Sequence, residues 1–276
     1  MTIRQYIPAR LKRMVRIATY WIIDKYYEMT GTRPPMTPPA MSALLVGSGD
    51  FKAIGKSLRS HLIEYCNMKP NSQVLEIGCG YGRVAIALSE FLNGEGSYDG
   101  VDVVKDATDW CTYEISKKYS NFRFHHADVS NPYAHKEVGQ SAVEYRFPFS
   151  EGQFDVVFLT SVFSHMRPPE IEAYLKEIGR VLKVGGKCLA TFYLLNDFSL
   201  KMISSRKSSQ NFAYKFDGFL STHSTTPEQT IAVYENQVRE FHISAGLHIH
   251  EPVHYGSWSG RSSSKGYQDT MVSERR

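Results

Sequence analysis

The sequence predicts an α/β domain built on a mostly parallel sheet, and three observations support this. Short apolar runs alternate with helical patterns, a glycine-rich loop joins the first run to a helix, and two further strand candidates close the chain. Alternation of this kind is typical of repeated strand-helix-strand units. The apolar runs cover residues 73–77, 98–103, 122–126, 154–160 and 187–194.

The intervening helices carry recognisable ends. The clearest begins at Pro168-Pro169 and stops at Gly185-Gly186, because proline suits a first helical turn and glycine a helix end. We expect a later helix at about residues 228–245, followed by strand candidates at 247–255 and 267–272 that form a hairpin.

The N-terminal segment predicts a separate element. Between Pro8 and about Tyr27 the apolar residues recur at helical spacing with basic residues between them, which indicates an amphipathic helix. Such a helix either packs on the domain with its basic side in solvent or lies on a surface of anionic lipid. The apolar positions are Leu11, Met14, Val15, Ala18, Trp21 and Ile22, and the basic ones are Arg10, Lys12, Arg13 and Arg16.

These patterns divide the chain into three parts. Residues 1–33 hold the basic helix, and residues 34–49 form a proline-rich linker or strap, because prolines hold their predecessors in extended conformations. Residues 50–276 form the main domain, in which Asp50 is the predicted N-cap of a helix ending near Cys66. Two segments of this domain, 131–151 and 196–226, are predicted as insertions that cap a ligand site.

Charge and cysteine content narrow the function classes. The 276 residues carry a net charge of +4, and the 27 basic and 28 acidic residues left without the first five basic ones give −1. A broad nucleic-acid surface is therefore not expected. The four cysteines have no metal-binding spacing, and no early apolar run has the length of a signal or membrane segment. We expect a cytoplasmic protein without a metal, whose attachment to the membrane surface remains open.

The glycine loop is the strongest functional signal. A buried strand runs into Gly78, Gly80 and Gly82 before a helix begins, and glycines here permit a tight turn and a close approach of ligand to backbone. Arg83 stands where a dinucleotide fingerprint has its third glycine. The carboxyl of Glu76 disfavours a diphosphate and favours a cationic ligand, and Asp102 ends the next strand where ribose hydroxyls are accepted.

These residues resemble motif I and the following acidic position of class I S-adenosylmethionine-dependent methyltransferases. Further segments agree with that family: 126–129, 152–158 and 177–186. The resemblance implies a Rossmann-like, doubly wound sheet of seven strands with an antiparallel last strand, S-adenosylmethionine as cofactor, and Asp128 near the adenine amino group. The predicted cofactor-binding residues are Glu76, Gly78, Cys79, Gly80, Tyr81, Gly82, Asp102, Val103, Asp128, Val129 and Ser161.

Methyl transfer to a hydroxyl requires removal of its proton, and His165 is the preferred base. It follows the fourth strand, at the sheet edge where α/β domains bind ligands, and its ordinary pKa lies near neutrality. The alternative is a histidine that only bonds backbone or seats the donor. Arg167 is predicted to hold an acidic substrate or to cap a helix.

The terminal hairpin predicts further acceptor contacts. If the strand at 247–255 is parallel to its neighbours, the loop after it overhangs the ligand edge with Trp258 and Arg261, which suit a sugar ring or a phosphate. The alternative is that Trp258 packs into the domain and Arg261 pairs with an acid. Tyr193, at the end of the fifth strand, joins this predicted acceptor site.

The acceptor remains open at this level. Residues 160–163 lack the pattern of enzymes that methylate nucleobase amino groups, so we expect a hydroxyl of a saccharide, a glycolipid or a small molecule. Two rival interpretations remain: a protein that binds S-adenosylmethionine without transferring its methyl group, and an oxidoreductase that uses a nicotinamide dinucleotide. The oligomeric state is not predicted.

Overall fold

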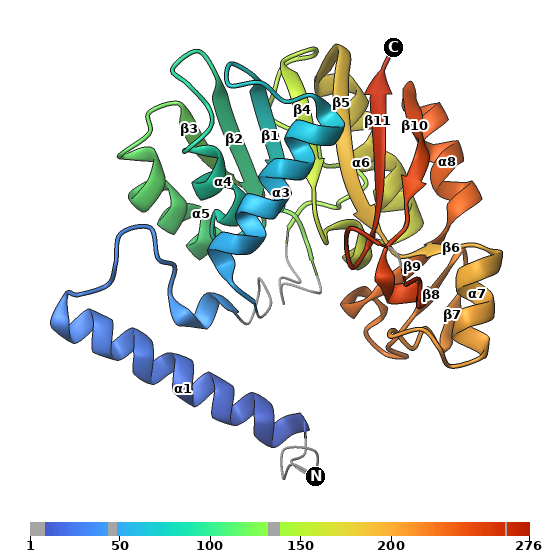
Figure 1. Ribbon diagram of the computed structural model, residues 1–276, viewed down its shortest axis with the longest axis horizontal. Helices are drawn as coiled ribbons and strands as arrows, with labels where there is room; N and C mark the ends of the chain where they lie inside the picture. Colours follow the sequence, from blue (N-terminus) through green and yellow to red (C-terminus); the bar gives the residue numbers. More distant parts are fainter. Residues whose placement is uncertain (1–8, 44–48, 132–138, 263) are drawn as a thin grey trace.

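The computed structural model describes residues 9–43, 49–131, 139–262 and 264–276, with the side chains of residues 9–13 left out. Its main body is a seven-stranded sheet in the order β10-β11-β5-β4-β1-β2-β3, flanked by helices on both faces (Figure 1). The strands are β1 Gln73–Ile77, β2 Ser97–Asp102, β3 Phe122–His126, β4 Phe154–Leu159, β5 Leu182–Phe192, β10 Leu247–His254 and β11 Asp269–Arg275. The predicted doubly wound fold is confirmed.

Strand β11 is the one antiparallel strand of this sheet: it pairs antiparallel with β5 on one side and β10 on the other. The predicted hairpin is therefore present, although its second strand begins at Asp269 rather than at residue 267. Since β10 consequently runs parallel to β5, the loop after it lies at the carboxyl edge, as expected.

Two apolar layers hold the sheet between its helices. On one face, Val156 and Phe158 pack with residues of α3 and α4; on the other, Val157 and Leu159 pack with residues of α6 and α8. This alternation follows from the two-residue period of a strand buried on both sides. The helices are α3 Phe51–Cys66, α4 Arg83–Leu88, α5 Lys105–Cys111, α6 Pro168–Val181, α7 Asp197–Ser204 and α8 Glu235–Ser244.

A second, four-stranded sheet adjoins the carboxyl edge in the order β6-β9-β8-β7. Its strands are β6 Leu194–Leu195, β7 Tyr214–Phe216, β8 Phe219–Ser221 and β9 Ile231–Tyr234. The helix predicted at 228–245 is therefore wrong in its first third: residues 227–229 form a short 3₁₀ turn, η5, and β9 follows it. The β-branched Ile231 and Val233 suit a strand that pairs with β8.

The N-terminal helix α1, Ala9–Thr30, lies outside the main body (Figure 1). Its Asp24 accepts hydrogen bonds from Arg33 and from the amides of Ala40 and Met41, so the proline-rich strap folds back onto the helix. Helix α3 then begins after Asp50, whose carboxylate accepts from the Ala53 amide at 2.9 Å. The predicted N-cap is confirmed.

Candidate active site

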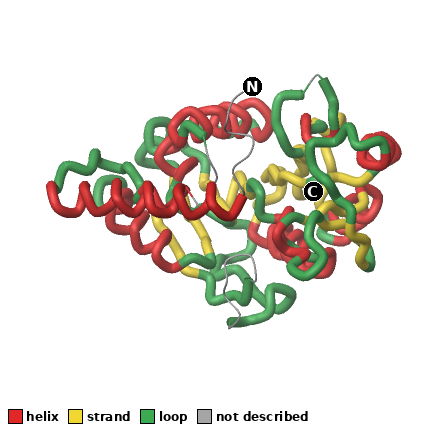
Figure 2. Tube along the Cα trace, turned by 90° about the horizontal axis from the view of Figure 1, so that it is seen from below, coloured by secondary structure: helices red, strands yellow, loops and turns green. Residues whose placement is uncertain are grey.

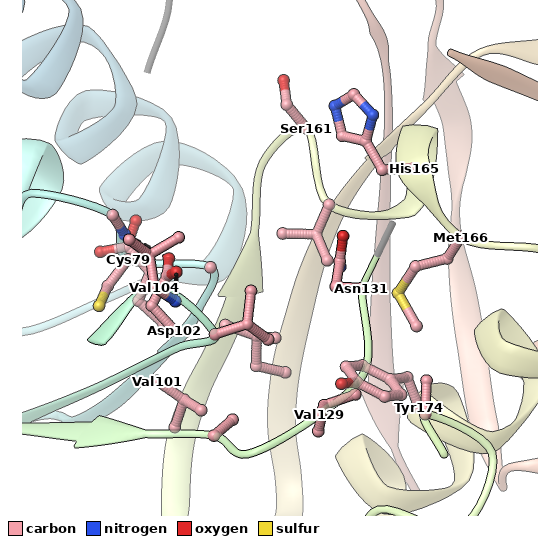
Figure 3. Close-up of a pocket in the computed structure, with 18 of the residues that line it drawn as sticks. Cys79, Val101, Asp102, Val104, Val129, Asn131, Ser161, His165, Met166 and Tyr174 are labelled. Carbon is pink, nitrogen blue, oxygen red and sulfur yellow. Dashed lines mark hydrogen bonds between the residues drawn. The ribbon is translucent and has the colours of Figure 1, made fainter. Parts of the chain in front are cut away.

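A cavity of about 680 Å³ opens at the carboxyl ends of the parallel strands, a volume typical of small-molecule sites. Its walls come from the loops after β1, β2, β3 and β4, with contributions from α3, α6 and η5. In Figure 3, Cys79, Asp102 and Val104 gather on one side, Met166 and Tyr174 on the other, and Ser161 and His165 together at one end. Open α/β sheets bind ligands at this edge.

The glycine loop forms one wall through its backbone. Gly78, Gly80 and Gly82 all adopt positive φ, at 79°, 48° and 68°. A Cβ on Gly78 would lie 2.4 Å from Val162 Cγ2, and one on Gly82 would lie 2.6 Å from Ile115 Cδ1. The turn therefore requires glycine at both positions for conformation and for space. It leaves a cradle with little side-chain bulk, suited to a ligand that lies close to the backbone.

Asp102 fixes this cradle to the next strand. Its Oδ2 accepts from the Gly80 amide at 2.7 Å, and its Oδ1 accepts from the Val104 amide at 2.9 Å. Burial raises the pKa of this carboxyl, while the two amide bonds act in the opposite direction. Each carboxylate oxygen has a second lone pair, so Asp102 can hold the loop and accept ribose hydroxyls as well.

Glu76 lies beneath the loop and is almost fully buried. Burial raises the pKa of its carboxyl to about 8, against the lowering effect of the hydrogen bond from the Tyr98 hydroxyl. Glu76 also lines the cavity. A positively charged ligand beside Glu76 would stabilise its ionised carboxylate, whereas a negatively charged diphosphate would be repelled by it.

The next part of the wall is apolar, and one predicted residue does not contribute to it. Val103, Ala127 and Val129 line the cavity beside the ends of β2 and β3, forming a slot suited to a flat base. Asp128 is exposed and is not among the described residues that line the cavity. At this strand end Val129 is buried and Asp128 is exposed beside it, so the contact of Asp128 with adenine stays a prediction.

His165 and its neighbours form the end of the cavity that follows β4. Ser161 has a φ of 60°, an uncommon conformation for a residue other than glycine, and its amide donates to Thr191 Oγ1. His165 lies in the short helix η4, Phe163–His165, and its Nδ1 is 2.9 Å from the Glu228 carbonyl oxygen. This carbonyl can accept a proton from Nδ1, and the backbone of Gln229 is a second hydrogen-bond partner of the ring.

Burial lowers the pKa of His165, so its imidazole is neutral at physiological pH. Glu228 also binds Arg167 through its side chain, since its Oε1 accepts a hydrogen bond from Arg167 Nε at 2.8 Å. Arg167 lines the cavity and stands at the N-cap of α6. Arg167 therefore occupies the N-cap position, but its side chain makes no cap hydrogen bond there, because its guanidinium pairs with Glu228.

The predicted acceptor contacts from the fifth strand and the terminal loop lie elsewhere. Trp258 is wholly buried between Tyr193 and Phe212, and its Nε1 donates to Asp269 Oδ2 at 2.7 Å. The Arg261 guanidinium lies 3.9 Å from the centre of the Phe198 ring and 4.3 Å from that of Tyr255.

These positions correct the sequence prediction for the terminal loop. Tyr193, Trp258 and Arg261 are absent from the described lining of the cavity, and the loop packs against the second sheet instead of overhanging the site.

The two predicted caps differ. From residues 139–151, Gly139, Ser141, Ala142 and Phe147 line the cavity, as expected of an insertion above the acceptor. Tyr133 falls outside the described residues. No residue of 196–226 lines the cavity as far as the structure describes it, because α7 and the β7–β8 hairpin complete the second sheet. The cap predicted there is corrected.

Several lining residues escaped the sequence analysis. Burial and the neighbouring Glu228 raise the pKa of Glu170, and Tyr174 stands one turn further along α6. Glu170 and Tyr174 could have been predicted from the sequence, because they lie in the first turns of a helix that follows a strand end. The missed residues include Leu58, Val104, Ala107, Met166, Glu170, Tyr174 and Glu228.

Comparison with known proteins identifies the kind of domain that carries this site. Residues 74–186 match a family model described as a methyltransferase domain. The PH0226 protein from Pyrococcus horikoshii has a similar fold, with a TM-score of 0.55 at 17% identity over 91% of this chain and 99% of that one.

Two curated relatives differ in the acceptors that their names state. Demethylmenaquinone methyltransferase from Staphylococcus haemolyticus is 29% identical over 138 residues, which is 49% of this chain and 50% of the relative. A tRNA N(3)-cytidine methyltransferase from Danio rerio is 27% identical over 164 residues, which is 56% of this chain and 41% of the relative. The chain spans about half the length of these relatives, and their acceptors differ in chemical class.

The fold, the glycine cradle and the family match together define the class. The match over residues 74–186 identifies a methyltransferase domain, and together with the glycine cradle it supports S-adenosylmethionine as the cofactor. The site fits this cofactor: the cradle of Gly78 and Gly82 admits no added Cβ, and the buried carboxyl of Glu76 suits a cation. No helix of the described residues is long and apolar enough to cross a membrane.

Proposed function

We propose that this protein transfers the methyl group of S-adenosylmethionine to a hydroxyl oxygen of an acceptor with an apolar body, either a small molecule or a lipid-linked intermediate. The bound cofactor supplies the methyl group on a sulfonium sulfur, which leaves as a neutral thioether and needs no further activation. The protein's tasks are to align the hydroxyl with that methyl group and to take its proton.

The single observation that carries the proposal is the state of His165. The Glu228 carbonyl can accept a proton from Nδ1, and burial keeps the ring neutral. A neutral imidazole at the wall of the cavity is a competent general base at physiological pH. His165 takes the hydroxyl proton on its unprotonated ring nitrogen, and the backbone hydrogen bonds with Glu228 and Gln229 favour the resulting imidazolium against the opposing effect of burial.

The apolar body of the acceptor is inferred from the wall opposite Asp102. Ala142, Phe147, Met166 and Tyr174 are buried side chains that line this part of the cavity. They offer a surface for a hydrocarbon or ring, and Glu170 adds one polar contact. With Trp258 buried elsewhere, the ring-stacking argument for a bare saccharide has lost its support, and a hydroxyl on an apolar scaffold is favoured.

The test is a transfer screen with S-adenosylmethionine labelled in its methyl group. The protein is incubated with lipid, small-molecule and saccharide extracts, and labelled products are analysed by mass spectrometry. An O-methylated product from the lipid or small-molecule extract supports the proposal, and an N-methylated or purely saccharide product overturns it. Binding of S-adenosylhomocysteine without any labelled product would favour a protein that binds the cofactor but does not transfer the methyl group.

His165→Gln tests the assigned base. General-base removal lowers kcat by about 10²-fold or more, while the affinity for S-adenosylhomocysteine measured by calorimetry stays within about twofold of the parent. His223→Gln, at an exposed histidine away from the cavity, is the matched control. Near-native turnover of His165→Gln would remove this residue from the mechanism.

A further inference from the structure

Helix α1 presents an exposed apolar face. We define this face by Met14, Val15, Ala18, Trp21, Ile22 and Met29, which recur at helical spacing and are all exposed. Met14 is 67% exposed, Trp21 57% and Ile22 60%. Lys25 lies among them in the helical register, and exposed apolar surface beside such charged residues marks an interaction site.

The opposite side of α1 is held by the rest of the chain. Asp24 is buried and accepts from the Arg33 guanidinium and from the amides of Ala40 and Met41. Ile17, Tyr20 and Tyr27 lie on the same side of the helix and are less exposed than the apolar face. These contacts fix the rotation of α1, because turning the apolar face inward would break the bonds of Asp24.

The charges of the segment indicate which partner this face meets. The sequence carries Arg4, Arg10, Lys12, Arg13 and Arg16 before its first acid, Asp24. A second copy of the chain packed in parallel would bring the same positive charges against these, whereas an anionic lipid surface is complementary to them. Each Lys or Arg near such a surface favours attachment, and apolar side chains beside them enter the boundary between headgroups and acyl chains.

The position of α1 relates this surface to the cavity. The helix lies on the side of the domain at which the parallel strands end, the side from which the cavity is built (Figures 1 and 2). A bilayer that receives the apolar face of α1 therefore lies next to that side of the protein.

We propose that α1 docks this protein on anionic membranes through its apolar face, so that the acceptor reaches the cavity from the bilayer. The first half of this proposal concerns binding alone. The second half rests on the proposed function and narrows its acceptor to a lipid-borne molecule.

Vesicle binding tests the docking step with the full chain. At low salt we expect cosedimentation with vesicles of equal parts phosphatidylglycerol and phosphatidylcholine, little with pure phosphatidylcholine, and weaker binding at about 0.5 M salt. The emission of the exposed Trp21 should shift to shorter wavelength on binding, and Trp21→Phe should lose this shift. No binding to the anionic vesicles at low salt overturns the proposal.

Ile22→Glu tests the apolar face, with Ile243→Glu as its matched control. Ile243 is 75% exposed on α8, so the control makes the same change of charge and size on another helix. We expect Ile22→Glu to weaken vesicle binding about tenfold or more and Ile243→Glu to leave it unchanged. Equal effects of the two variants, or a dimer in sedimentation analysis that Ile22→Glu abolishes, would overturn the proposal.

Two further measurements separate this proposal from the proposed function. Both variants should bind S-adenosylhomocysteine as the parent does. With a total lipid extract as substrate, Ile22→Glu should lose methyl transfer when the extract is in anionic vesicles and keep it when the extract is dispersed in detergent. Equal transfer in both forms overturns the lipid route. Vesicle binding without transfer to the lipid extract leaves docking intact and overturns the lipid-borne acceptor, whereas absence of transfer to every extract overturns the proposed function.

Discussion

The amide of Gly80 donates to Asp102 Oδ2 at 2.7 Å, so the carboxylate that ends β2 holds the glycine loop that follows β1. The two carboxylate oxygens of Asp102 accept from the amides of Gly80 and Val104. Asp102→Asn keeps one of these acceptors and places an NH₂ group against the other amide. A lost charge-assisted bond amounts to about 1.5 to 3 kcal/mol. Calorimetry should show that S-adenosylhomocysteine binds at least about tenfold more weakly.

The matched control for this variant is Asp106→Asn. Asp106 is exposed in the first turn of α5, only a few residues from Asp102, and its substitution removes the same charge. It should bind S-adenosylhomocysteine like the parent. If the two variants weaken binding equally, the general loss of negative charge explains the effect, and the contact with Gly80 does not.

Gly78→Ala would add both backbone strain, from the positive φ, and a steric clash with Val162. Substitution of Gly152 measures the backbone strain alone. Gly152 has a φ of 63° and open space around its missing Cβ, so Gly152→Ala should lower the free energy of unfolding by about 1 kcal/mol from conformation alone. Gly78→Ala also places its Cβ against Val162 and should lose a further 1 to 3 kcal/mol, roughly.

Urea denaturation of both variants measures this difference. Val162→Ala removes the obstructing carbon and should recover part of the loss in the Gly78→Ala background, which is a favourable coupling in a double-mutant cycle. Additive effects of the two substitutions would show that the close contact with Val162 does not limit the loop.

The carboxyl of Glu76 predicts a pH dependence of stability. Burial raises its pKa to about 8, above its value in the unfolded chain, so the folded state binds the extra proton. Its contribution to stability is complete below about pH 4.5 and is lost as the pH rises through about 8. Between about pH 7 and about pH 9 the loss amounts to roughly 1.4 kcal/mol.

Glu76→Gln should remove this loss, and Glu95→Gln, at an exposed position, should keep it. Denaturation of the three proteins over this pH range is the measurement. If the parent and Glu76→Gln respond identically to pH, Glu76 is not the group responsible.

Sequence reasoning reached the parts of the site that depend on short stretches of chain. Asp102 ends a strand, and the glycine loop, Ser161 and His165 follow strand ends within a few residues, so locating the strand ends was enough to place them together. Beyond β3 the sequence does not fix which side chain turns inward, because a shift of one residue exchanges inward and outward side chains, and Val129 rather than Asp128 lines the described cavity.

The remaining errors concern contacts between distant segments. Ile231 and Val233 become a strand because β8 pairs with them, and no pattern within 228–245 carries that information. Likewise, the apolar face of α1 predicts an amphipathic helix, but its exposure follows from the contacts of Asp24 with the strap. Pairing and packing of this kind override local preference.

Trp258 joins distant segments in the same way, and Trp258→Phe tests its corrected role. Its indole is wholly buried and donates to Asp269, whose pKa burial raises to about 6. Phenylalanine removes the donor and leaves a void, so the free energy of unfolding should fall by about 2 to 4 kcal/mol. Trp110→Phe, at a half-buried indole, should lower the free energy of unfolding much less in the same denaturation experiment.

Because Trp258 does not line the cavity, Trp258→Phe should leave the KM for the acceptor unchanged below the melting temperature. A raised KM with unaltered stability would restore Trp258 to the acceptor site.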